Sequence, residues 1–118
     1  MKEGKKMGNK IMKNIESAKA LALTDLVTYQ DGQVVSKTLV QNPNVSLTLF
    51  SFDKGEEIST HSSHGDAMVY VIDGQAEITI GEEKFNVKAG KTIVMPSEVP
   101  HAVAAPDQRM KFMLTVVF

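Results

Sequence analysis

All three histidines of the chain lie in two short segments that are rich in residues able to bind a metal or transfer a proton. His61 and His64 stand in the segment STHSSHGD, which ends at Asp66, and His101 follows the segment MPSEVP. Imidazole is a common metal ligand and a common general acid or base near neutral pH. The chain contains no cysteine, so thiolate ligands and thiolate nucleophiles are excluded. Any metal site must therefore use nitrogen and oxygen ligands.

The segments around the histidines have the pattern of short β-strands separated by turn residues. Only residues 15–26 could form a helix. Many short strands at even spacing predict an all-β sandwich or barrel. The expected strands span residues 34–40, 45–52, 67–72, 76–80, 84–87, 92–95, 101–104 and 110–118.

The pair Asp73-Gly74 predicts a tight turn, because both residues accept the positive φ values of a two-residue hairpin. We therefore expect residues 68–72 and 75–80 to be antiparallel neighbours. Side chains alternate along a strand, and both faces of the first segment are apolar, as are both faces of residues 110–118. We expect both segments to be covered on two sides, the last as a central strand or at a contact with another subunit.

Length and composition indicate one ordinary globular domain. The chain has 118 residues, 42% of them hydrophobic and 23% charged, with a net charge of −1. We expect a disordered basic tail at residues 1–13, which carry five lysines and one glutamate, and a single domain at residues 14–118. The rest of the chain has no stripe of basic residues of the kind that binds nucleic acids. The apolar residues between Ala18 and Leu23 are interrupted by Lys19 and are too few for a membrane span. The absence of cysteine fits a cytoplasmic location.

Spacing groups the histidines with glycines and a proline into two motifs. The first motif begins at Gly55, contains His61 and ends at Gly74. The second motif begins at Gly90, contains Pro96 and ends at His101. This arrangement resembles the cupin superfamily, with motifs GxxxxxHxH, then a glutamate and a glycine, and GxxxxxPxGxxHxxxN. The chain is identified as a member, a small single-domain cupin of the cupin 2, RmlC-like type. The resemblance implies an all-β, double-stranded β-helix (jelly-roll) barrel with a short N-terminal segment, a pocket for a small-molecule ligand, and a homodimer.

The ligand set of the family carries over only in part. His61 and His101 fall on ligand histidines, whereas Ser63 and Ala67 occupy the positions of the second histidine and the glutamate. Within the second motif, Glu98 takes the place of a glycine. The resemblance implies a divalent transition metal, Zn, Fe, Ni or Cu, held by the two matching histidines.

His64 is a third candidate ligand, but it lies one residue beyond the motif position. Asp66 is likewise displaced by one residue from the glutamate position. A shift of one residue turns a strand side chain to the opposite face, so His64 reaches the pocket only through a loop or bulge. The alternative is a surface imidazole, or one that supports the ligands from outside the metal shell.

Several functions stay open at this point. The first is a metal-binding cupin with catalysis on a small organic acid or sugar derivative; its catalytic residues are not assigned. The second is a non-catalytic ligand-binding or sensory cupin without metal, since Ala67 removes the carboxylate. An interaction protein that has lost its site has less support. A hydrolase triad of Ser62 or Ser63 with His64 and Asp66 has even less, because no nucleophile elbow surrounds either serine.

Overall fold

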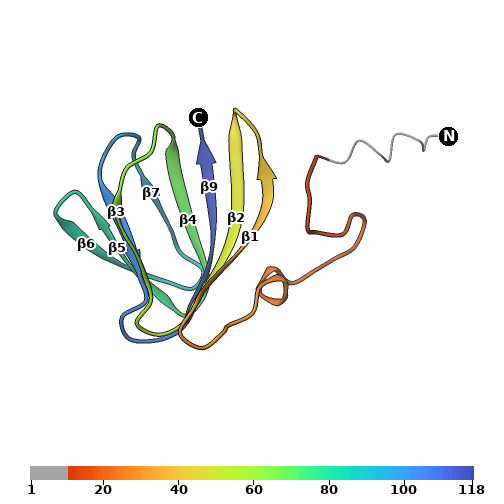
Figure 1. The fold of residues 1–118 in the computed structure, drawn as a ribbon, viewed down its shortest axis with the longest axis horizontal. Helices are drawn as coiled ribbons and strands as arrows, with labels where there is room; N and C mark the ends of the chain where they lie inside the picture. The colour runs from red at the N-terminus through yellow and green to blue at the C-terminus, as the bar shows by residue number, and fades with distance from the viewer. Residues whose placement is uncertain (1–10) are drawn as a thin grey trace.

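The computed structural model describes residues 11–118, which form an antiparallel β-sandwich (Figure 1). Every strand expected from the sequence is present, with ends within one residue of those expected. One further strand, β3, was not expected, and the possible helix at residues 15–26 is only a 3-10 turn, η2. The elements are η2 (Leu23–Leu26), β1 (Val34–Gln41), β2 (Val45–Phe52), β3 (Glu57–His61), β4 (Asp66–Asp73), β5 (Gln75–Ile80), β6 (Glu83–Lys88), β7 (Thr92–Met95), β8 (His101–Ala104) and β9 (Met110–Val117).

The strands form two facing sheets. One sheet has the order β1-β2-β9-β4-β7, and the other has the order β3-β8-β5-β6, with antiparallel pairing throughout. Figure 1 shows the two sheets facing each other, with the loops β3–β4 and β7–β8 at the same end of the sandwich. This arrangement confirms the predicted all-β jelly-roll fold. It also confirms the last strand, β9, as a central strand between β2 and β4.

The predicted hairpin at Asp73-Gly74 is wrong in one respect. Gly74 does adopt a positive φ of 74°, as the turn requires. However, β4 and β5 belong to different sheets, so they are not paired neighbours. A side-chain carbon at residue 74 would come within 2.1 Å of the carbonyl oxygen of Arg109. Glycine is therefore needed here because the chain crosses between sheets against another segment, in addition to the backbone freedom it supplies.

The main core fills the space between the sheets. Alternate residues of β4, Ala67, Val69 and Val71, are buried there, as the strand period predicts. Phe112 of β9 is at the centre of an aromatic cluster, with its ring centroid 5.0 Å from that of Phe50. Such pairs are favourable beyond the area they bury. This packing fixes the strands that carry the candidate site.

The outer face of the larger sheet is covered over only part of its width. Residues of the N-terminal segment, including Val27, pack on β1 and β2. Lys111 of β9 anchors this segment, because its ammonium group donates a hydrogen bond of 2.7 Å to the carbonyl oxygen of Thr24. Met68 and Tyr70 lie on the uncovered part and are 38% and 36% exposed. The prediction that both faces of this strand are covered is therefore wrong for β4 in a single chain.

The predicted basic tail lies mostly outside the described residues, which begin at residue 11. Within the described part, the backbone amide of Lys13 donates a hydrogen bond of 2.8 Å to the carbonyl oxygen of Leu39. This bond attaches the segment to β1. Between residues 11 and 118, no helix has the length and apolar character needed to span a membrane.

Candidate functional site

A bulge in β3 brings His61 to the inner side of the sandwich. Ile58 pairs with Val103 of β8, and His61 pairs with His101, so β3 holds one extra residue between the two pairs. In a regular strand, positions 58 and 61 would point to opposite faces, because side chains alternate. The extra residue restores the alignment, which is a common use of β-bulges. Both Ile58 and His61 consequently line the same cavity.

The two imidazole rings lie side by side, with their centroids 4.5 Å apart and their planes at 75°. Each ring is oriented by a backbone carbonyl two residues earlier in the chain. Nδ1 of His61 donates to the oxygen of Ser59 at 2.9 Å, and Nδ1 of His101 donates to the oxygen of Val99 at 3.1 Å. A ring that carries its proton on Nδ1 has its lone pair on Nε2 when it is neutral. Each histidine therefore offers Nε2 as a ligand.

Burial keeps His101 neutral at ordinary pH. The side chain is buried, with 2% of the residue exposed, whereas His61 is exposed at the pocket mouth. Burial lowers the pKa of His101, and the neighbouring His61 lowers this pKa further, while the hydrogen bond to Val99 acts in the opposite direction. A neutral imidazole is the form that binds metal.

The two histidines line a cavity of about 70 Å³. Its walls are mainly aliphatic and aromatic side chains from both sheets. Met95 and Ala67 are each only 2% exposed, so this part of the cavity is deeply buried. His101 is equally buried, whereas the apolar residues Ile58 and Leu114 are partly exposed. Its lining consists of Ile58, His61, Ser63, Ala67, Met95, His101, Val103, Phe112, Leu114 and Val116.

His64 lies outside this cavity, on the loop between β3 and β4. Its side chain is 91% exposed, and its Nδ1 donates a hydrogen bond of 2.8 Å to the carboxylate of Glu98. Two further bonds join the same loops: Ser97 Oγ donates to the oxygen of His64, and the Ser97 amide donates to Asp66. The structure therefore brings His61 and His101 together and places His64 in a link between two loops at the mouth.

Glu98 holds this link from a left-handed backbone conformation, with a φ of 68°. Glycine adopts such angles at little cost, whereas other residues are disfavoured there. The cupin motif has a glycine at this position, so the substitution introduces local strain and adds the carboxylate that contacts His64. The backbone amide of Glu98 also donates a hydrogen bond of 2.8 Å to the carbonyl oxygen of Ser63.

The remaining sequence candidates have clear positions. Ser63 and Ala67 line the cavity, as their places in the motif imply. The hydroxyl of Ser63 donates to the oxygen of Gly65 at 2.9 Å and is not bonded to His64, so no hydrolase triad is assembled. Among residues 11–118, no cluster of three or more histidine, cysteine or acidic side chains could hold a metal. Any metal here would rest on two protein nitrogens.

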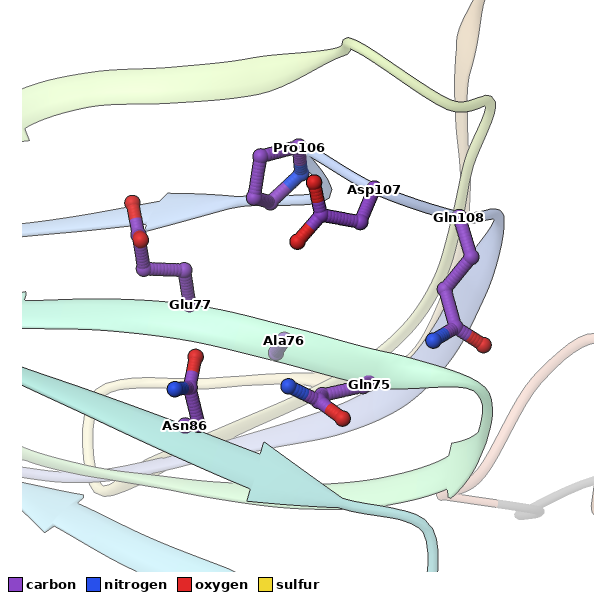
Figure 2. Close-up of a pocket in the computed structure, with 7 residues that line it drawn as sticks. All are labelled: Gln75, Ala76, Glu77, Asn86, Pro106, Asp107 and Gln108. Atoms are coloured by element: carbon purple, nitrogen blue, oxygen red, sulfur yellow. The ribbon is translucent and has the colours of Figure 1, made fainter.

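A second, separate depression lies between β5, β6 and the β8–β9 loop (Figure 2). Its volume of about 10 Å³ has room for about one water molecule. Most of its lining side chains are polar, and none of the histidines contributes to it. The lining residues are Gln75, Ala76, Glu77, Asn86, Pro106, Asp107 and Gln108.

Comparison with known proteins agrees with this geometry. The model of the cupin domain family matches residues 48–118. The chain belongs to the cupin family. A conserved protein of unknown function from Streptococcus pyogenes is 48% identical to this cupin, with a TM-score of 0.89 over 92% of this chain and 94% of the other. A cupin superfamily protein from Desulfitobacterium hafniense is 29% identical, with a TM-score of 0.85 over 91% and 97% of the two chains.

Among curated proteins, an uncharacterized protein of Methanocaldococcus jannaschii is 28% identical to this cupin over 81 residues. The match covers 63% of each chain. This cupin thus spans less than two thirds of the length of the curated relatives that it matches.

Proposed function

We propose that this cupin holds a divalent transition metal between His61 and His101 and binds a small organic ligand beside it. The observation that carries the proposal is the tautomer of the two rings. Both Nδ1 atoms donate to backbone carbonyl oxygens, which leaves both Nε2 atoms as lone-pair donors on adjacent strands. Hydrogen bonds from Nδ1 to backbone carbonyl oxygens commonly orient metal-binding histidines and raise the basicity of the ring.

The donor set fits a borderline metal better than a hard one. Two imidazole nitrogens suit Zn, Cu, Ni or Fe, whereas Mg and Ca require oxygen ligands. Ala67 stands where the cupin motif has its glutamate, so the pocket itself supplies no carboxylate. The site therefore has two protein ligands, and its remaining positions are open to water or ligand. A metal so bound would act as a Lewis acid that polarises a ligand oxygen.

The other pocket residues would bind and enclose the ligand. Phe112, Leu114 and Val116 of β9 form an apolar wall, which excludes water from one side of the ligand. The depressed pKa of His101 keeps its ring unprotonated, so protons compete weakly for its Nε2 atom. The link between His64 and Glu98 would hold the two mouth loops in place.

A second candidate function is ligand binding without metal. It is favoured by the two-ligand donor set, because each missing ligand weakens a metal site. In this case the two Nε2 atoms would accept hydrogen bonds from a small molecule in the same cavity. A non-catalytic, sensory role would follow, since no carboxylate lines the pocket to serve as a general base.

Elemental analysis of protein purified without a histidine tag separates the two functions. The metal-binding function predicts a transition metal near one equivalent per chain, and its return after chelation and addition of Zn²⁺. Protein that lacks metal as purified and does not take up Zn²⁺ would contradict it and favour the metal-free function.

We also propose that the chain is a homodimer. Val94 of β7 pairs with Met68 of β4, and both stand on the uncovered outer face of the larger sheet. They are 49% and 38% exposed, and the partly exposed Tyr70 extends the same apolar surface. Contiguous exposed apolar surface of this kind marks an interaction site. A second copy of the chain would complete the covering that the N-terminal segment begins.

A further inference from the structure

We infer that the chain has a further ligand site, a cleft at one edge of the sandwich that binds a small amphipathic anion. This edge cleft lies between β6 and β7, has a volume of about 390 Å³ and is lined by residues 85–88 and 91–93. It shares no residue with the histidine pocket. Small-molecule sites commonly have volumes in this range. The inference goes beyond the proposed function and requires no metal.

The edge cleft exists because β6 and β7 are edge strands of different sheets. β6 pairs only with β5, and β7 pairs only with β4. A short turn joins the two strands, and in it the backbone amide of Lys91 donates a hydrogen bond of 2.9 Å to the carbonyl oxygen of Lys88. From this turn the strands diverge into their separate sheets, and none of the described strands lies between them. The turn therefore closes one end of the cleft.

The inner wall of the edge cleft is apolar. Phe85 and Val87 alternate with outward-facing residues along β6, and Ile93 does so on β7, so these three side chains face the core. Val87 is buried, whereas Phe85 and Ile93 are only partly buried. Their exposed surface favours contact with the apolar part of a ligand. Val94, which belongs to the proposed dimer contact, points to the opposite side of β7, so the cleft and that contact are separate.

Two lysines give the edge cleft a positive charge. Lys88 and Lys91 are exposed on either side of the turn. Within residues 11–118, no acidic side chain lines the cleft and neither lysine forms an ion pair, whereas Lys84 of the same strand is 3.7 Å from Glu77. The backbone amides of residues 89–91 already bond to carbonyl oxygens. An anionic group at the turn would therefore be bound by the two ammonium groups.

The length of the edge cleft limits the size of the ligand. Each wall contributes three or four consecutive residues, and a strand rises about 3.3 Å per residue, so the cleft is about 10 Å long. Phe85 lies three residues before Lys88 on one wall, and Ile93 lies two residues after Lys91 on the other. A ligand with its anionic group at the turn would thus place its apolar body against these side chains. Octanoate, an extended acid of comparable length, is a suitable probe.

An NMR titration of the isotope-labelled full chain tests the inference with octanoate, butanoate and octylammonium. Octanoate should shift the backbone amide signals of residues 85–93 in a saturable manner. Butanoate should bind about tenfold or more weakly, because each buried CH₂ group contributes about fourfold in affinity. Octylammonium has the same alkyl chain with the opposite charge and should bind about fivefold or more weakly than octanoate. Octylammonium binding as tightly as octanoate, or octanoate shifts confined to the histidine pocket, would overturn the inference.

Lysine variants test the charge of the edge cleft directly. Lys88→Gln combined with Lys91→Gln should weaken octanoate binding about fivefold or more, and the remaining binding should depend less on salt. Lys84→Gln is the matched control, because Lys84 lies on the same edge strand outside the cleft. It should change the affinity less than twofold, a result that the modest strength of a single exposed charge pair allows. Equal weakening by the double variant and by Lys84→Gln would overturn the assignment of the anionic group to the turn.

The alternative role of these lysines is to protect an exposed sheet edge, since charged side chains there prevent pairing with another chain. That role requires no ligand. Absence of saturable octanoate shifts at residues 85–93 would favour it and overturn the inference. Because His61 and His101 lie outside the edge cleft, such a result would leave the proposed function of the histidine pocket unchanged.

Discussion

His61 on β3 and His101 on β8 are direct cross-strand partners, with their ring centroids 4.5 Å apart. The pairing depends on the β3 bulge, which turns His61 back to the face that Ile58 shares. One ring is exposed and the other is buried, so the pair spans the boundary between solvent and the apolar cavity. The candidate metal site therefore arises from a local irregularity in an otherwise regular strand.

The lowered pKa of His101 predicts a loss of stability in mild acid for the metal-free protein. The unfolded chain protonates this residue near the ordinary pKa of about 6.5, and the folded chain does so only at lower pH. Between these values the unfolded state binds more protons than the folded state. The contribution of the neutral His101 to the free energy of unfolding is therefore fully present above about pH 6.5 and is lost as the pH falls through the lowered pKa. Urea unfolding of chelator-treated protein from pH 7 to pH 5 measures this fall.

The His101→Asn variant is the control for that measurement, since its side chain does not titrate in this range. Its free energy of unfolding should depend less on pH between 7 and 5 than that of the unmodified chain. An identical pH dependence in both proteins would show that His101 is not the source.

The left-handed conformation of Glu98 predicts a difference between two small substitutions at this position. Glu98→Gly and Glu98→Ala both remove the carboxylate that contacts His64, but only glycine relieves the backbone strain. We expect Glu98→Gly to be more stable than Glu98→Ala by about 1 kcal/mol. Thermal or urea unfolding of the two variants side by side gives this difference. Glu98→Ala equal to or above Glu98→Gly would mean that position 98 is not strained.

Much of the fold could be predicted from the sequence, because strand signals there are local. The alternation of Ala67, Val69 and Val71 predicted the inner face of β4, and these residues are buried. Turn residues predicted the strand ends closely. Which strands become neighbours is a tertiary property, however. The same Asp73-Gly74 turn serves a hairpin or a crossing between sheets, and only the close approach of Arg109 distinguishes them here.

The site could be predicted only in part for the same reason. Motif spacing identified His61 and His101, and the structure brings them together. The strand β3 was missed because its residues do not alternate in polarity, since the bulge interrupts the period. The partner of His64 was also missed, because Glu98 lies far along the chain on another loop. One feature of the sequence did indicate that position 98 is unusual: Glu98 stands at a motif position where the cupin family has glycine.

The uncovered outer face predicts a dimer that a single charge would disrupt. Sedimentation equilibrium at tens of micromolar protein, an order-of-magnitude working concentration, should give a dimer for the unmodified chain. Val94→Lys places a charge beside Met68 in the proposed contact and should give a monomer. Thr79→Lys on the opposite sheet is the control and should remain dimeric. A monomeric unmodified chain, or a dimeric Val94→Lys variant, would argue against this surface as the interface.

The most direct test of the proposed function is the Zn²⁺ stoichiometry of three histidine variants, measured by calorimetry and elemental analysis. His61→Ala and His101→Ala should each abolish stoichiometric binding, because either change leaves a single protein ligand. His64→Ala should keep one equivalent, with affinity changed by less than about tenfold, since this side chain contacts Glu98 and is outside the cavity. Stoichiometric Zn²⁺ in both His61→Ala and His101→Ala would contradict the account.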